Sequence, residues 1–243
     1  MVTDNQDRRG KRRATLIKRA LADLSNRINR IAPTGKKLLP KTVHRFILLR
    51  VLDVNRDYKS FADLPSRRFL EHEVLPWMRD TCARILFVGT ASYTHHYENL
   101  FRRNRGQFTT VDCNPSAKVW GARQHIVASV LDIGLCRPAG SFDCVVLNGV
   151  FGFGVDDVDA MRTTIEAIHG ILDLDGLLVL GWNTSRHADP ASLGVLEPFF
   201  SATPQSPWGP VRRFPSETHV YNFYTRRPAA GLDHRSRDLE MKK

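Results

Sequence analysis

The sequence has few of the features that mark metal-binding, disulfide-rich or membrane-spanning proteins. Its 243 residues include only four cysteines, and none belongs to a CxxC pair or lies near a histidine at zinc-ligand spacing. No apolar run approaches the about 20 residues that a helix needs to cross a bilayer. The N-terminus also lacks the apolar segment of a signal peptide. We therefore expect no metal site and a cytoplasmic protein whose thiols stay reduced.

Acidic residues are scarce at the start of the chain. Residues 1–50 contain fourteen Lys or Arg and three Asp, whereas the rest of the chain contains 22 basic and 22 acidic residues. The net charge of +11 therefore belongs to the N-terminal part. We expect residues 1–13 to form a disordered basic arm, which can bind an anionic membrane surface or an anionic polymer. Nucleic acid is the less favoured partner because the balanced remainder supplies no basic track.

Residues 14–80 predict a helical extension. Apolar residues recur every three or four positions over 14–31, while Lys and Arg fall on other faces. This helix either docks its apolar stripe on the rest of the protein or helps to bind the anionic partner. A second helix is expected at 41–53 and a third near 66–79, where Pro76 disturbs it.

Residues 81–227 alternate short apolar runs with helical stretches, a pattern typical of a parallel sheet. The expected strands are residues 85–88, 108–111, 126–128, 144–147 and 177–180, followed by an antiparallel strand at 219–226. The clearest helix covers residues 156–172. The predicted fold class is α/β, with a doubly wound, mostly parallel sheet, and residues 228–243 are expected to form a flexible tail.

Three features follow successive predicted strands, at the edge where open parallel sheets bind ligands. Gly89 can form a tight turn, Asp112 lies 23 residues later, and Ser129 and Val130 follow the third strand. A carboxylate at this spacing can accept both hydroxyls of a ribose. Separately, each feature also fits a structural role: Gly89 an ordinary turn, and Asp112 the N-cap of a helix. Together they predict an adenosine-type ligand, and a loop with one glycine is a poor cradle for the pyrophosphate of a dinucleotide.

Over residues 84–227 the sequence resembles the class I S-adenosylmethionine-dependent methyltransferases, in the segments VDCNPSA, SFDCVVLNGVFGF and IHGILDLDGLLVLGWN. The resemblance implies a seven-stranded sheet whose last strand is antiparallel, with S-adenosylmethionine as the cofactor. It places Gly89 at the methionine moiety, Asp112 at the ribose, Ser129 and Val130 at the adenine, and Asn148 beneath the sulfonium. The predicted cofactor-binding set also includes Ala91, Tyr93 and Cys113. The family's first motif differs here, because Phe87, Ala91 and Tyr93 replace an acid and two glycines.

Methyl transfer from a sulfonium is an in-line displacement, so the main task of such an enzyme is to align the acceptor. A hydroxyl acceptor benefits from a base, and the candidates are His95, His96 and Asp156, although both histidines also fit exposed helix positions. The block that begins at Asn148 lacks the two prolines of enzymes that methylate planar nitrogens.

We therefore interpret the chain as a methyltransferase for a small-molecule or saccharide-like acceptor, at oxygen in preference to nitrogen. Two alternatives stay open. One is a non-catalytic nucleotide or S-adenosylmethionine binder that acts through its basic arm, and the other is an N-methyltransferase acting on nucleic acid or protein.

Overall fold

The computed structural model describes residues 41–46, 48, 49, 63–103, 107–203 and 205–228. The chain divides into two units, Met1–Lys59 and Ser60–Lys243. In the first unit the structure describes helix α2 (Lys41–Phe46), which falls within the helix expected at 41–53.

Several predictions concern other parts of the chain. The basic arm at 1–13, the helix at 14–31 and all but the first residue of the tail at 228–243 lie outside the described residues. The anionic partner assigned to the arm therefore stays a prediction.

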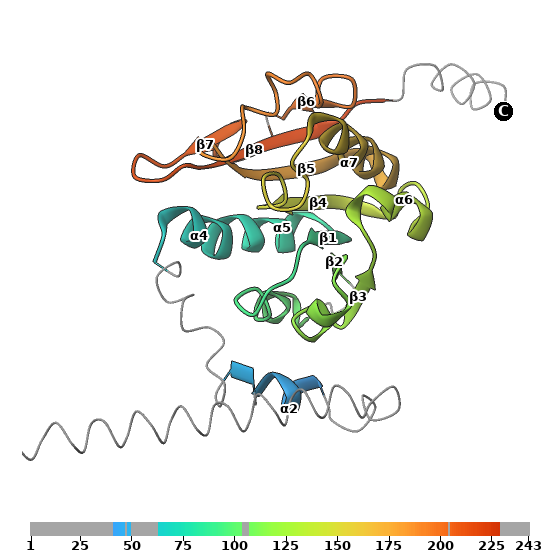
Figure 1. Cartoon of the computed structure of the whole chain (residues 1–243), viewed down its shortest axis with the longest axis vertical. Helices are drawn as coiled ribbons and strands as arrows, with labels where there is room; N and C mark the ends of the chain where they lie inside the picture. Colours follow the sequence, from blue (N-terminus) through green and yellow to red (C-terminus); the bar gives the residue numbers. More distant parts are fainter. Residues whose placement is uncertain (1–40, 47, 50–62, 104–106, 204, 229–243) are drawn as a thin grey trace, which may run out of the picture. The chain divides into compact units, whose positions relative to one another are not determined.

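The second unit is built on a single mixed sheet with the strand order β3-β2-β1-β4-β5-β8-β6, which Figure 1 shows from bottom to top. The strands are β1 (Ile85–Val88), β2 (Phe108–Asp112), β3 (Gln124–Val127), β4 (Phe142–Asn148), β5 (Leu172–Asn183), β6 (Phe200–Ala202), β7 (Val211–Arg213) and β8 (His219–Arg226). Strands β1 to β5 are parallel, and β8 runs antiparallel to β5.

Eight strands fill seven positions of this sheet. Strand β8 pairs with β5 along one edge, β6 pairs with its C-terminal part, and β7 pairs with its N-terminal part. Because β5 occupies one edge of β8, β6 and β7 must share the other. The predicted fold class is confirmed, with this division of the edge position as a small difference.

Helical segments cover both faces of the sheet. They are α4 (Pro65–Phe69), η3 (Leu70–Val74), α5 (Leu75–Thr81), η4 (Tyr97–Phe101), η5 (Pro115–Val119), η6 (Val130–Asp132), α6 (Ile133–Cys136) and α7 (Val158–Ile171). Successive strand residues point to opposite faces, so Leu86 and Val88 pack with residues of α6 and α7, while Ile85 and Phe87 pack with residues of α4, η3, α5 and η4. The sheet is thus buried on both faces, as parallel sheets require.

The helical stretch expected near 66–79 is continuous through its proline. Pro76 has no N–H group and its ring excludes the carbonyl one turn earlier. The chain accommodates Pro76 with a π-helical turn, η3, directly before α5, where the Leu75 N–H donates to the carbonyl of Leu70. Phe69, Leu70 and Met78 stay buried against the sheet as a result.

None of the helices that the structure describes combines the length and hydropathy needed to span a bilayer.

Candidate functional site

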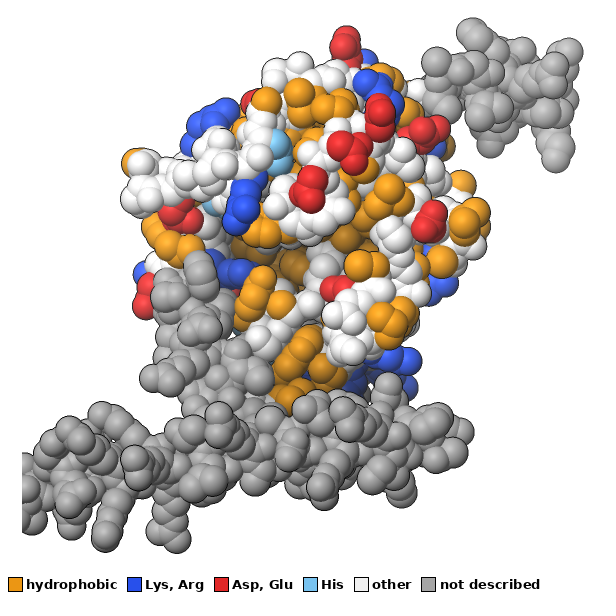
Figure 2. Space-filling view, in the orientation of Figure 1, with side chains coloured by type: hydrophobic (Ala, Val, Ile, Leu, Met, Phe, Trp, Pro, Cys, Tyr) orange, Lys and Arg blue, Asp and Glu red, His pale blue; other side chains and the backbone are white. Residues whose placement is uncertain are grey.

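The strand register brings the predicted cofactor residues to one edge of the sheet. Val88 at the end of β1 pairs with Val111 of β2 on one side and with Leu147 of β4 on the other. Gly89, Asp112 and Asn148 therefore lie at neighbouring strand ends, at the carboxyl edge where open α/β sheets bind ligands. Figure 2 shows one face of the molecule, with a hollow near its centre and hydrophobic side chains at the floor of the hollow.

Asp112 ties two loops of this edge together. Its Oδ2 accepts a hydrogen bond from the Thr90 N–H at 2.7 Å, and its Oδ1 accepts one from the Asn114 N–H at 2.8 Å. The Thr90 hydroxyl has a single proton to donate, either to Oδ2 of Asp112 at 3.3 Å or to the carbonyl of Ala117 at 3.2 Å. Asn114, not Asp112, caps the following helix, because its side-chain oxygen accepts from the Ser116 N–H at 2.9 Å. A carboxylate has about four acceptor positions. Asp112 thus keeps the capacity to accept further hydrogen bonds at a half-buried position.

The turn after β1 is open at Gly89. This residue has φ +85°, a backbone conformation that side-chain-bearing residues rarely adopt, and a Cβ added to it would meet no atom within 4 Å. The residues that follow form a turn, in which the Thr94 N–H donates to the carbonyl of Ala91 at 2.9 Å. The ring of Tyr93 is covered by the guanidinium of Arg67, 4.6 Å from its centroid.

The residues expected at the adenine have partly structural roles. The hydroxyl of Ser129 caps η6 by accepting from the Leu131 N–H at 3.2 Å, which leaves its own proton available. The side chain of Val130 is buried in the core, whereas Cys113 is exposed beside Asp112.

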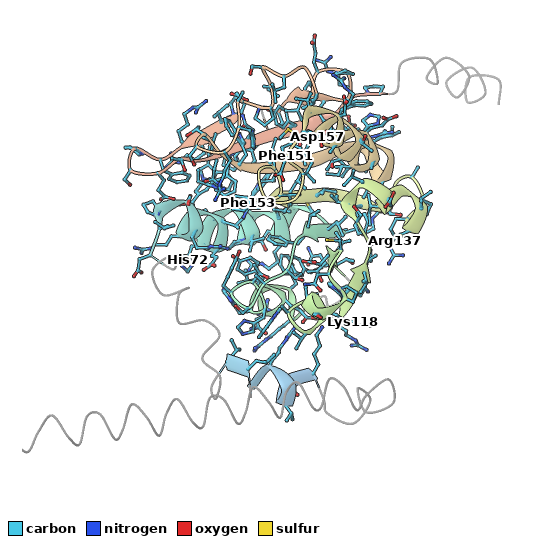
Figure 3. All side chains as sticks on the ribbon, in the orientation of Figure 1. His72, Lys118, Arg137, Phe151, Phe153 and Asp157 are labelled. Atoms are coloured by element: carbon cyan, nitrogen blue, oxygen red, sulfur yellow. The ribbon has the colours of Figure 1, made fainter. Side chains whose placement is uncertain are left out.

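The three candidate bases come from two loops. His95 donates from Nδ1 to the carbonyl of Ser92 at 2.6 Å, and His96 Nε2 lies 3.7 Å from the carboxylate of Glu71. Asp156 is exposed in the loop before α7, where it accepts from the Gly154 N–H at 3.3 Å. Figure 3 labels Phe151, Phe153 and Asp157 of the same loop. The structure places all three candidates in loops that follow strands at the carboxyl edge of the sheet.

A charged cluster beside these histidines was missed by the sequence analysis. Arg67 donates to the hydroxyl of Tyr97, which donates in turn to Glu71 at 2.9 Å. Burial opposes ionisation of Glu71, but hydrogen bonds from His96 and Tyr97 outweigh it and lower the pKa of Glu71. The cluster thus fixes an ionised carboxylate next to the candidate base His96.

A second group of polar residues was also missed. His219, the first residue of β8, has Nε2 3.0 Å from Oδ1 of Asn148 and Nδ1 3.2 Å from Oδ1 of Asn183. Desolvation, together with the charge of Arg67, lowers the pKa of His219 to about 4. The imidazole is therefore neutral at physiological pH. Its position at a strand start gave no sequence signal, since the contact to Asn148 depends on strand order.

Two hollows differ in their place relative to this edge. One of about 360 Å³ opens beside His219 and is lined by Thr184, Arg213, Phe214 and Glu217 among others. A larger one, of about 900 Å³, is lined by residues such as Cys82 and Gln107, which precede β1 and β2. It lies at the amino edge of the sheet and so belongs to another part of the molecule.

No family model matches the sequence, and no curated protein matches it. Several solved structures do match the chain in fold. The N-methyltransferase NodS from Bradyrhizobium japonicum WM9, in complex with S-adenosyl-L-homocysteine, is 17% identical, with a TM-score of 0.52 over 72% of this chain and 94% of that chain. The 1,6-didemethyltoxoflavin-N1-methyltransferase from Burkholderia thailandensis, with bound 1,6-didemethyltoxoflavin and S-adenosylhomocysteine, is also 17% identical, with a TM-score of 0.50 over 78% of this chain and 91% of that chain. The chain therefore has the fold of the class I S-adenosylmethionine-dependent methyltransferases.

Proposed function

We propose that this protein is an S-adenosylmethionine-dependent methyltransferase that acts on a small-molecule or saccharide-like acceptor, at oxygen. The observation that carries the proposal is the carboxylate of Asp112, fixed at the end of β2 by two backbone N–H groups with acceptor capacity left, beside the open turn at Gly89. A fixed anionic acceptor pair matches the cis-diol of a ribose. Both neighbours named above are described as bound to S-adenosylhomocysteine, which supports the same cofactor here.

The residues at this edge fit the cofactor group by group. The space in front of Gly89 receives the methionine moiety, and the free hydroxyl proton of Ser129 and the backbone at Val130 suit a purine edge. When bound, S-adenosylmethionine supplies a methyl group already activated for displacement. The chain's own residues then have to hold the acceptor in line with that methyl and exclude water.

The hollow beside His219 suits the acceptor. A volume of about 360 Å³ lies at the lower end of small-molecule sites. Thr184 and Arg213 offer hydrogen-bond donors that fit the hydroxyls of a sugar ring, while Phe214 can pack against its apolar face. Each oxygen of Glu217 accepts one hydrogen bond from Ser66 and keeps a further acceptor position. The neighbour from Burkholderia thailandensis is named for methylation of a small molecule, 1,6-didemethyltoxoflavin, which supports a small-molecule acceptor here.

Oxygen as the acceptor atom is supported by the backbone after Asn148. Gly149 has φ +64°, which proline cannot adopt because its ring holds φ near −65°. The proline-containing geometry of enzymes that methylate planar nitrogens is therefore incompatible with this turn. For a hydroxyl acceptor, we propose His95, His96 or Asp156 as the base. His96 is favoured because its Nε2 lies 3.7 Å from the carboxylate of Glu71, which would stabilise a proton taken up by the ring.

The proposal is tested by incubating the full chain with methyl-labelled S-adenosylmethionine and extracts, and analysing the products by mass spectrometry. We expect label in small molecules, on oxygen. Label on nucleic acid or protein nitrogen would support the N-methyltransferase alternative. Cofactor binding without any transfer would support the non-catalytic alternative, in which the basic arm at residues 1–13 acts on an anionic surface or polymer.

A further inference from the structure

Two of the four cysteines lie next to each other inside the protein. Cys82 is the C-cap of α5, and Cys144 belongs to β4, where it pairs with Ile85 at the start of β1. Both thiols are free and buried, and both residues belong to the apolar cluster on the face of the sheet that α5 covers. The methyl-transfer site proposed above lies at the opposite edge of the sheet and uses neither of them.

One carboxylate fixes the backbone around the two cysteines. Oδ2 of Asp143 accepts hydrogen bonds from the N–H groups of Ala83 at 2.8 Å and Arg84 at 2.9 Å. Ala83 follows Cys82 in the chain, and Asp143 precedes Cys144. These hydrogen bonds therefore hold the end of α5 against β4, with both cysteines on the same face of the sheet.

The two thiols differ in how readily they ionise. A hydrogen bond between the side chains lowers the pKa of Cys82, against the effect of burial, whereas burial and the same hydrogen bond raise the pKa of Cys144. The Thr81 hydroxyl, 3.6 Å from Sγ of Cys82, has a single proton and also lies 2.8 Å from the carbonyl of Trp77. The contact with Cys144 is thus the main stabilisation of a Cys82 thiolate, and Cys144 keeps its proton.

A hollow gives small molecules access to Cys82. The hollow of about 900 Å³ at the amino edge of the sheet includes Cys82 in its lining. Cys82 is 7% exposed, whereas Cys144 is completely buried. An oxidant that enters the hollow therefore meets Cys82 first. Because so little of this residue is exposed, the oxidant must be small.

We propose that Cys82 and Cys144 form a redox site, at which hydrogen peroxide converts the two thiols into a disulfide. The Cys82 thiolate attacks one peroxide oxygen, the O–O bond breaks, and hydroxide leaves, so Cys82 becomes a sulfenic acid. The sulfur of Cys144 then attacks the sulfur of Cys82, and the S–O bond breaks. The oxygen leaves as water with the Cys144 proton, and the hydroxide takes up the proton that Cys82 had lost. The thiols lose two electrons in total, and one peroxide is reduced to two waters.

The disulfide ties α5 to β4 and closes a long loop that contains β1, β2 and β3. A cross-link that closes a long loop stabilises a protein mainly by restricting its unfolded chain. Gly89 and Asp112 lie at the other edge of the sheet, so the oxidised chain keeps its cofactor edge open. The redox site thus goes beyond the proposed function and does not depend on it.

The first test treats the unmodified full chain with hydrogen peroxide and maps its peptides by mass spectrometry without reductant. We expect one cross-linked pair of peptides, which contains Cys82 and Cys144 and separates after addition of dithiothreitol. Unreacted thiols at both positions would overturn the inference. A sulfinic or sulfonic acid at Cys82 without a cross-link would also overturn it, because Cys144 would then be unable to reach the oxidised sulfur.

The second test assigns the roles of the two thiols with dimedone, which labels sulfenic acids. In Cys144→Ser we expect dimedone on Cys82, since no second thiol condenses with the sulfenic acid. In Cys82→Ser we expect Cys144 to stay unlabelled. The matched control Cys136→Ser changes an exposed cysteine and should leave the cross-link in place. Equal labelling of Cys144 in Cys82→Ser would contradict the assignment of Cys82 as the attacking thiol.

The third test measures what the disulfide does to the protein. We expect the oxidised chain to melt at least about 4 °C above the reduced chain, with the affinity for S-adenosylhomocysteine changed by less than about twofold. An equal or lower melting temperature would contradict the stabilising role. If the reduced chain does not bind S-adenosylhomocysteine at all, the proposed function fails, whereas the peptide map still decides whether the redox site exists.

Discussion

The substitution Gly181→Ala places a methyl group where the structure has no room for one. The new Cβ would lie 2.0 Å from the side-chain oxygen of Asn148 and 2.9 Å from the ring of Tyr221. Tyr221 is buried, with 1% of its surface exposed, so its ring has little freedom to move. Asn148 is the side chain that must turn away, and it then loses its contact with His219.

The expected change in stability combines two costs and one gain. Leaving a buried polar group without its partner costs about 1–3 kcal/mol. Forcing an extra methyl group into a packed region costs a similar amount, about 1–3 kcal/mol. Replacing glycine by alanine also reduces the conformational entropy of the unfolded chain, which raises the free energy of unfolding by about 0.4–1 kcal/mol. We therefore expect Gly181→Ala to lower the free energy of unfolding by about 3 kcal/mol.

Urea denaturation of the variant and of a matched control measures this cost. The control is Gly170→Ala, which lies in α7, where an added Cβ meets no atom within 4 Å. Alanine is the better helix former there, so the control should be more stable by up to about 1 kcal/mol. If Gly181→Ala is as stable as the unmodified chain, the contact between Asn148 and His219 does not depend on the glycine and our account of it is wrong.

Three further predictions concern the ribose site, the buried imidazole and the basic arm. Asp112→Ala should weaken binding of S-adenosylhomocysteine at least tenfold, about 1.4 kcal/mol, through loss of charge-assisted hydrogen bonds. Calorimetry measures the affinity, and the control is Glu197→Ala, which removes an exposed carboxylate before β6. Equal affinities of the two variants would contradict the prediction. The pKa of His219 is about 4 in the folded chain and its ordinary value is 6.5, so below pH 6.5 the unfolded chain binds a proton that the folded chain does not. The free energy of unfolding should therefore fall with acidification, by about 2 kcal/mol near pH 5 from this residue alone; His219→Gln should reduce that pH dependence in urea titrations, and an unchanged slope would refute the assignment. Deletion of residues 1–13 should leave the melting temperature nearly unchanged and weaken binding to anionic vesicles, whereas a large drop in melting temperature would make the arm structural.

The strands were predictable where a local pattern determines them. The apolar run at 85–88 and the alternation at 219–226 coincide with β1 and β8, and the helix expected at 156–172 is two residues longer at its start and one at its end than α7. These segments are buried on one or both faces, so the spacing of their apolar residues reflects which faces are buried. Strands β6 and β7 are three residues long and lie at the edge of the sheet, too short to produce a period.

The candidate site was only partly predictable, because its contacts join residues that are far apart in the sequence. Asp112 followed from its place after a strand, but its hydrogen bond to Thr90 depends on the pairing of β1 with β2. The contact between Asn148 and His219 requires the strand order β4-β5-β8 and a glycine in the middle strand. No local pattern encodes such an arrangement, so His219 was found only in the structure.

The central claim is that a nucleoside binds across the ends of β1 and β2 through Asp112. Calorimetric titration of the full chain with S-adenosylhomocysteine tests it most directly. We predict saturable binding of one ligand per chain. Heat signals that do not rise above the dilution control at millimolar ligand would contradict the claim.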